Sequence, residues 1–66
     1  MTVTCHVVGP GGLVANFDFD EVPRNGEYVL LPGGGGPPRY FRVDRVVFAA
    51  VGLASPSIEL FVSAAS

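Results

Sequence analysis

The side chains best suited to binding an anion are gathered in the middle of the chain. Arg39, Tyr40 and Arg42 follow a run of four glycines and two prolines, and Arg24 lies in the turn before that run. Guanidinium groups bind phosphate through charge-assisted hydrogen bonds, aromatic rings stack on bases, and glycines leave backbone N–H groups accessible. This pattern predicts a candidate ligand site made of Arg24, Gly34, Gly35, Arg39, Tyr40 and Arg42.

The glycine run, Gly33 to Gly36, lacks the other parts of a phosphate-binding loop. No Gly-Lys-Ser/Thr ending follows it, the chain has no lysine, and no helix pattern comes next. A flexible connection between two strands is therefore the simpler interpretation. On a strand, Tyr40 and Arg42 share a face whereas Arg39 points the other way. We expect one subunit to use Tyr40 with Arg42, and two subunits meeting at an axis to be needed for Arg39 with Tyr40.

Residues with catalytic or metal-binding chemistry are few and badly placed. Cys5 and His6 are neighbours on an expected strand, so they point to opposite faces and cannot form a dyad. Cys5 is interpreted as a core residue and His6 as a surface or interface residue. Asn16, Asp18 and Asp20 offer oxygen ligands for calcium, but no loop closes around them, and a solvated face is the simpler interpretation. We predict no enzymatic activity, no metal site and no cofactor.

Length and composition predict one domain, residues 1–66, that associates with itself. Such a short chain buries only about 60% of the surface its unfolded form exposes, and its single cysteine excludes an internal disulfide. The chain is 48% hydrophobic but only 15% charged, against about 25% charged in an average domain. The excess apolar surface predicts a homo-oligomer of closed symmetry. A crowded core with an apolar monomer surface is the alternative.

Charge and hydropathy exclude two classes of partner. The net charge is −2, and four arginines against six carboxylates provide no broad basic face, so general nucleic-acid binding is not expected. The longest apolar run, Val46 to Ala54, is far shorter than the roughly 18 residues of a membrane helix. The first ten residues do not resemble a signal peptide. We expect a cytoplasmic protein with a reduced thiol.

Period-two alternation of apolar and polar residues predicts five strands with short turns. The ranges are Thr2–Val8, Leu13–Asp20, Glu27–Leu31, Arg39–Phe48 and Ile58–Ser63. The segment Pro32–Pro38 is expected to be an exposed loop. Ala49–Ser57 is expected to be a wide hairpin loop, with a short helix as the alternative. The fold class is therefore all-β, a small, strongly bent antiparallel barrel.

Alternation fails once, in the strand from Arg39 to Phe48. A one-residue bulge near Asp44 and Arg45 restores it, placing Phe41, Val43, Val46 and Phe48 on one side. The core is then expected to contain Val3, Cys5, Val7, Phe17, Phe19, Val29, Leu31, Phe41, Val43, Val46, Ile58, Leu60 and Val62. The weakest choice is Val29 and Leu31 over Tyr28 and Leu30, because all four are apolar. Expected interface residues are Val14, Leu53 and Phe61.

One stretch of the chain resembles a known family. Pro23-x-x-Gly26-Glu27-x-Val29-x-Leu31, followed by Tyr40-Phe41-x-Val43-x-x-Val46, is similar to the small SH3-like β-barrel proteins of bacteriophages and prophages. The resemblance spans residues 23–46, and the glycine run and the apolar loop after Phe48 depart from the family pattern. It implies a five-stranded SH3-like barrel that works in binding or assembly rather than catalysis, in the cytoplasm of an infected or lysogenic bacterial cell.

Two functions from different classes remain. The first is a non-enzymatic accessory, assembly or host-blocking protein that acts by protein–protein contact and self-association. The second is a homo-oligomeric trap that sequesters a small anionic ligand, such as a signalling nucleotide, between its subunits as an anti-defence protein. An oligomer with an arginine-lined pocket between subunits would favour the second, and an exposed apolar patch would favour the first.

Overall fold

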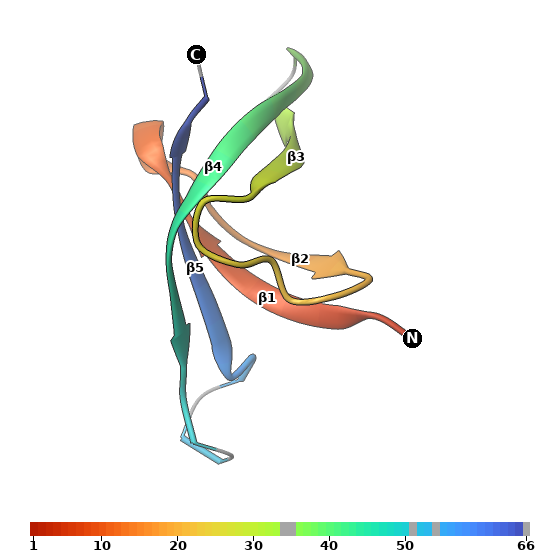
Figure 1. The fold of residues 1–66 in the computed structure, drawn as a ribbon, viewed down its shortest axis with the longest axis vertical. Helices are drawn as coiled ribbons and strands as arrows, with labels where there is room; N and C mark the ends of the chain where they lie inside the picture. The colour runs from red at the N-terminus through yellow and green to blue at the C-terminus, as the bar shows by residue number, and fades with distance from the viewer. Residues whose placement is uncertain (34–35, 51, 54, 66) are drawn as a thin grey trace.

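A computed structural model describes residues 1–33, 36–50, 52–53 and 55–65. The chain forms a single five-stranded sheet with the strand order β2-β1-β5-β4-β3. The strands are β1 (Val3–Val8), β2 (Val14–Phe19), β3 (Tyr28–Gly33), β4 (Gly36–Phe48) and β5 (Ile58–Ala64), with a 3-10 turn η1 (Pro10–Gly12) between the first two. Figure 1 shows the sheet curled into a half-barrel, with β4 and β5 running along its length. The all-β prediction is confirmed.

The first hairpin forms as its sequence predicts. β1 and β2 pair antiparallel from Val3↔Phe19 to Val8↔Val14. Gly11 and Gly12 in the turn have φ angles of 68° and 78°, a conformation that favours glycine. The Gly9 N–H donates to the Leu13 carbonyl at 2.8 Å and closes the turn. Glycine is therefore needed here for its backbone conformation, which the breaker pattern in the sequence indicated.

The prediction of an antiparallel sheet throughout is wrong for one pair of strands. β1 and β5 run parallel, with His6 opposite Glu59 and Val8 opposite Phe61. Parallel neighbours need a long connection, and three strands lie between β1 and β5 in the chain. The remaining pairs are antiparallel, so the sheet is mixed.

The hairpin of β3 and β4 is longer than predicted. β3 extends to Gly33 and β4 begins at Gly36, and these two glycines pair with each other. The expected exposed loop from Pro32 to Pro38 is therefore wrong at both ends, because the prolines sit in the outermost part of a ladder, where proline is tolerated. Gly34 and Gly35 lie outside the described residues.

The bulge in β4 is confirmed. The register with β5 shifts between Val43, which pairs with Val62, and Arg45, which pairs with Phe61. Asp44 is the extra residue, and the shift returns Val46 to the core side. A bulge increases local twist and bends the strand, in agreement with the curl of β4 in Figure 1.

The core lies on the inner face of the curled sheet. Every predicted core residue is either buried or packed against the buried cluster, and Leu13 joins them. The choice of Val29 and Leu31 as the inward side of β3 is confirmed. The fully buried side chains of largest volume are Leu31, Leu60, Val7, Val43 and Cys5.

Two connections complete the fold. The segment between β2 and β3 returns to the middle of the sheet in Figure 1, where Gly26 donates its N–H to the Val43 carbonyl at 2.7 Å. The connection between β4 and β5 is a hairpin loop, closed by a 2.7 Å bond from the Ala49 N–H to the Ser57 carbonyl. The described residues of that loop contain no helix. Among the residues that the structure describes, no helix is long and apolar enough to cross a membrane.

Candidate functional site

The predicted ligand residues do not meet in one place. Tyr40 and Arg42 lie on the outer face of β4, on either side of the buried Phe41. Arg39 points to the other face and lines a hollow beside the η1 turn. Arg24 lies in the connection after β2 and lines a separate hollow. Period-two geometry therefore separates Arg39 from Tyr40 and Arg42 within one subunit, as the sequence indicated.

The outer face of the β3–β4 hairpin carries a cluster of large, exposed side chains. Tyr28 is 64% exposed, Leu30 54% and Tyr40 62%. Tyr28 is paired with Arg42 across the two strands, and Leu30 with Tyr40, which places these side chains side by side on one face. We call Tyr28, Leu30, Tyr40 and Arg42 the outer patch. Sequence reasoning found only half of it, because Tyr28 and Leu30 were left as alternatives for the core.

The charge of Arg42 is only weakly engaged. Its Nε and Nη2 atoms donate to Oδ1 of Asp44 at 3.3 and 3.2 Å. The side chains are 57% and 39% exposed, so solvent screens the pair, and such a surface ion pair contributes at most about 1 kcal/mol. A carboxylate or phosphate from a partner can therefore compete for this guanidinium at small cost.

The three expected interface residues lie in different settings. Val14 is 59% exposed at the start of β2, and Leu53 is 80% exposed in the β4–β5 loop. Phe61 faces outward but is half-buried, because the Arg45 guanidinium carbon lies 4.5 Å from its ring centroid. A cation over an aromatic face is a favourable contact. Phe61 is thus covered by its own chain, whereas Val14 and Leu53 are open to solvent.

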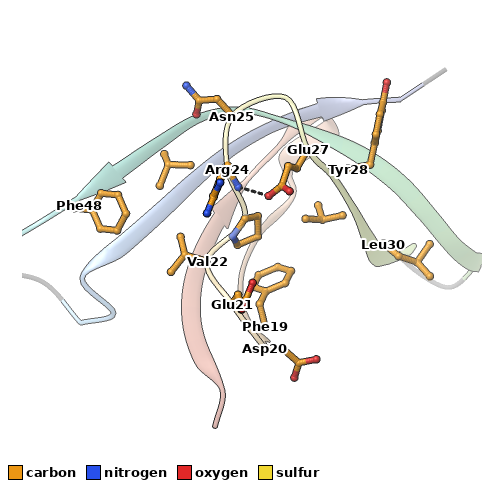
Figure 2. A pocket seen from close by; sticks show the side chains of 13 residues that line it. Phe19, Asp20, Glu21, Val22, Arg24, Asn25, Glu27, Tyr28, Leu30 and Phe48 are labelled. Atoms are coloured by element: carbon orange, nitrogen blue, oxygen red, sulfur yellow. Dashed lines mark hydrogen bonds between the residues drawn. The ribbon is translucent and has the colours of Figure 1, made fainter.

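The hollow that contains Arg24 is large and acidic. It has a volume of about 1180 Å³, and Figure 2 shows it between the end of β2, the following connection, and β3. Its apolar lining includes Phe19, Val22 and Phe48, of which Phe48 is 68% exposed. Asp20, Glu21 and Glu27 line the same hollow, so three carboxylates stand against the single guanidinium of Arg24. The surplus of negative charge disfavours an anionic ligand here.

Within this hollow the connection is held by a local turn. The Arg24 N–H donates to Oε1 of Glu27 at 2.8 Å, drawn as a dashed line in Figure 2, and the Glu27 N–H donates to the Arg24 carbonyl at 3.1 Å. Gly26 has a φ of 85°, which completes the turn. Glu27 is thus engaged in shaping the turn, and Arg24 contributes its backbone to the same turn.

The second hollow contains Arg39. It has a volume of about 830 Å³ and lies between the η1 turn and the outer end of the β3–β4 hairpin, with Leu13, Pro37 and Phe41 in its walls. Arg39 is the one charged side chain among its described lining residues. No second guanidinium of the same subunit converges on it, so the arginine pair expected for an anion site is not assembled here.

The residues with catalytic potential are separated or already hydrogen-bonded. Cys5 is completely buried, and burial, assisted by the negative charge of Asp18, raises the pKa of its thiol. His6 points outward, and its Nδ1 donates to Oδ1 of Asn16 at 2.8 Å. Thr4 Oγ1 donates to Asp18 Oδ1. A raised pKa leaves little thiolate for nucleophilic attack, and the predicted carboxylate row serves to link β1 with β2.

No group of three or more potential metal ligands is gathered among the residues with described positions. The side-chain hydrogen bonds between β1 and β2 join partners that face each other in the strand register. Their geometry is that of a stabilised strand pair rather than of a metal cage.

The chain was also compared with known protein families, curated proteins and solved structures, and no match was found in any of the three comparisons. The features of this molecule that could bind a partner are the outer patch, the two hollows and the edges of the sheet.

Proposed function

We propose that this chain is a non-enzymatic binding protein that acts through protein–protein contact and self-association. The observation that carries the proposal is the outer patch, in which Tyr28, Leu30 and Tyr40 are each more than half exposed on two paired strands. Tyrosine and arginine are enriched at the centres of protein interfaces, because they combine apolar area with hydrogen-bonding groups. Arg42 supplies the guanidinium beside them.

The setting of the patch supports the same function. It lies on a hairpin whose inner residues, Leu31 and Val43, are buried, so the backbone that carries the outer side chains is attached to the core. A preorganised surface loses less conformational entropy on binding than a mobile loop. The resemblance of residues 23–46 to small phage barrels favours an accessory, assembly or host-blocking role in the cytoplasm of an infected or lysogenic bacterial cell.

The self-association part is tested by measuring the molar mass in solution. Sedimentation velocity from low to high micromolar concentration is expected to show species heavier than the 6.9 kDa monomer. A single 6.9 kDa species throughout would contradict this part of the proposal.

The anion trap is a second candidate, supported by a smaller part of the same patch. Arg42 lies opposite Tyr28 and shares a face with Tyr40, so a guanidinium and two aromatic rings are available to one planar, charged ligand. The separation of Arg24 and Arg39 from this group weakens the candidate. Calorimetry with cyclic and linear nucleotides distinguishes the two functions, since heat that is lost in Arg42→Ala would favour the trap.

A further inference from the structure

β3 offers an unpaired backbone edge. It is the last strand in the sheet order, so only β4 lies beside it. The Glu27 carbonyl accepts the Val43 N–H at 2.8 Å and therefore faces β4. Backbone polar groups alternate sides along a strand, so Val29 and Leu31 direct theirs to β4. The N–H and C=O groups of Tyr28 and Leu30 then point away from the sheet.

This edge lacks the usual protection against strand pairing. From Tyr28 to Gly33 the strand contains no charged residue. Exposed edges are normally protected by charged side chains, bulges or prolines. In β3 these features are confined to the end of the strand, where Pro32 removes a donor and the register with β4 shifts between Leu31 and Gly33. Tyr28 and Leu30, by contrast, keep both a donor and an acceptor.

We propose that β3 pairs antiparallel with β3 of a second copy of this chain, across a two-fold axis at Val29. The inference rests on the proposed function and names the surface through which self-association occurs. In this register Tyr28 lies opposite Leu30 of the second copy, and each of them both donates to and accepts from the other's backbone. The two half-barrels then share one continuous sheet.

Pro32 selects this register over its neighbour. If the axis passed through Leu30 instead, Pro32 would lie opposite Tyr28. Proline has no N–H to give to the Tyr28 carbonyl, so one acceptor would lose its partner. With the axis at Val29, the outward groups of Tyr28 and Leu30 are all satisfied, which buried polar groups require.

The side chains of the outer patch fit the same arrangement. Leu30 already has Tyr40 as its neighbour across β4, and Tyr28 has Arg42. Pairing through β3 would place Leu30 between Tyr40 and the Tyr28 of the second copy. Each row across the joined sheets would run Tyr40, Leu30, Tyr28, Arg42, with the last two from the second copy. Aromatic and aliphatic cross-strand pairs of this kind stabilise sheets.

Self-complementarity is what identifies a second copy as the occupant. A two-fold interface brings each residue against the same surface of its partner, so a charged strand would meet like charge. β3 carries none between Tyr28 and Gly33. The nearby carboxylates belong to Glu27, which is held in the turn before the strand, and to Asp20 and Glu21 across the hollow. The two Arg42 side chains would lie at opposite ends of the rows. A chain this short also gains from burying apolar area that its own core cannot cover.

The mass of matched lysine variants tests the interface. Leu30→Lys adds a charge beside the axis and is expected to raise the dimer dissociation constant about tenfold or more, which corresponds to about 1.4 kcal/mol. Val47→Lys, at an exposed position of β4 beyond the part that pairs with β3, is expected to leave it unchanged. A wild-type protein that stays monomeric would overturn self-association altogether. An oligomer unaffected by Leu30→Lys would overturn only the β3 interface.

Amide hydrogen exchange on the wild-type protein makes the test independent of variant folding. The Val29 and Leu31 amides are expected to exchange slowly at every concentration, because they bond to β4. The Tyr28 and Leu30 amides are expected to slow at least tenfold as the dimer forms. Equal exchange of these two amides in monomer and oligomer would exclude β3 as the interface. If the Tyr28 and Leu30 amides were protected only after a different protein was added, pairing with a second copy would be excluded.

Discussion

The two edges of this sheet differ in chemistry although both belong to one small half-barrel. On β2, the outward residues Asn16 and Asp18 are hydrogen-bonded to β1, and Asp20 and Glu21 follow directly. Two β2 edges brought together would place these carboxylates near one another. β3 has no charge from Tyr28 to Gly33 and exposes Tyr28 and Leu30 instead. The carboxylate of Glu27, just before the strand, accepts the Arg24 N–H within the turn. If the protein associates with itself, this difference favours the β3 side over the β2 side.

The inner faces of β2 and β3 also differ, and here β3 is the more deeply buried strand. On β3, Leu31 is 1% exposed and Val29 7%, whereas Phe17 and Phe19 of β2 are only partly buried. The edge strand without charged residues is thus the one buried more deeply in the core. A strand whose inner side chains are buried in the core can expose its outer face and stay folded when a partner binds or leaves.

The largest effect on stability is expected from truncating Leu31, the most deeply buried side chain of β3. Leu31→Ala removes a buried side chain from the core and should lower the free energy of unfolding by about 2–5 kcal/mol, through lost apolar burial and the cavity left behind. In a domain of this size such a loss can unfold the protein. Urea unfolding followed by circular dichroism measures it.

Leu30→Ala is the matched control, because it makes the same substitution one residue away on the outer face. At a concentration where the protein is monomeric, it is expected to change the free energy of unfolding by no more than about 0.5 kcal/mol. Equal losses in the two variants would show that the faces of β3 are not as different as their burial indicates.

Much of this fold could be predicted from sequence because it depends on local pattern. Alternating residues identified the strands, and the failure of alternation at Asp44 identified the bulge. The predicted antiparallel barrel did not include the parallel pairing of β1 with β5, since it joins the two ends of the chain and no turn fixes its direction. The extent of the β3–β4 hairpin was underestimated because glycine and proline have low strand propensity, and pairing with the opposite strand overrode that preference.

The candidate site was less accessible to sequence reasoning. Alternation correctly separated Arg39 from Tyr40 and Arg42, but the placement of Arg24 among carboxylates depends on how the connection after β2 folds back. Tyr28 and Leu30 were ambiguous because both sides of their strand are apolar. An apolar residue on an exposed edge gives the same sequence signal as one in the core, so the outer patch required the structure.

A smaller effect is expected from removing the charge that protects the other edge. Asp18→Val deletes the acceptor of the Thr4 hydroxyl and a negative charge from β2. The free energy of unfolding should change by about 1 kcal/mol or less, while β2 becomes able to pair. Sedimentation velocity is expected to show species larger than those of the wild type.

Asp18→Asn provides the control for that experiment, since it retains a hydrogen-bond acceptor and removes only the charge. Its assemblies should be intermediate in size between those of the wild type and Asp18→Val. If Asp18→Val sediments like the wild type, then charge on β2 is not what keeps that edge unpaired.

The smallest effect concerns Cys5, which faces Phe17 of β2 and so reports on that half of the sheet. Burial, and then the charge of Asp18, raise the pKa of this thiol above its ordinary value of 9.0. As the pH rises past that value, the unfolded chain loses the thiol proton before the folded chain does. The folded state then binds more protons, so the free energy of unfolding should decline. The contribution is fully present below the ordinary pKa and is lost only in the alkaline range.

The measurement is the difference in unfolding free energy between the wild type and Cys5→Ala, followed from neutral to alkaline pH. The substitution lowers stability at every pH by leaving a cavity, but only the wild type should carry the alkaline decline, so the difference is expected to shrink. A difference that is constant with pH would mean that the folded and unfolded thiols ionise alike. Oligomerisation through β3 should leave this pH dependence unchanged, because β5 and β4 lie between β3 and β1, the strand that carries Cys5. Opening of β2, by contrast, should expose the thiol to alkylation.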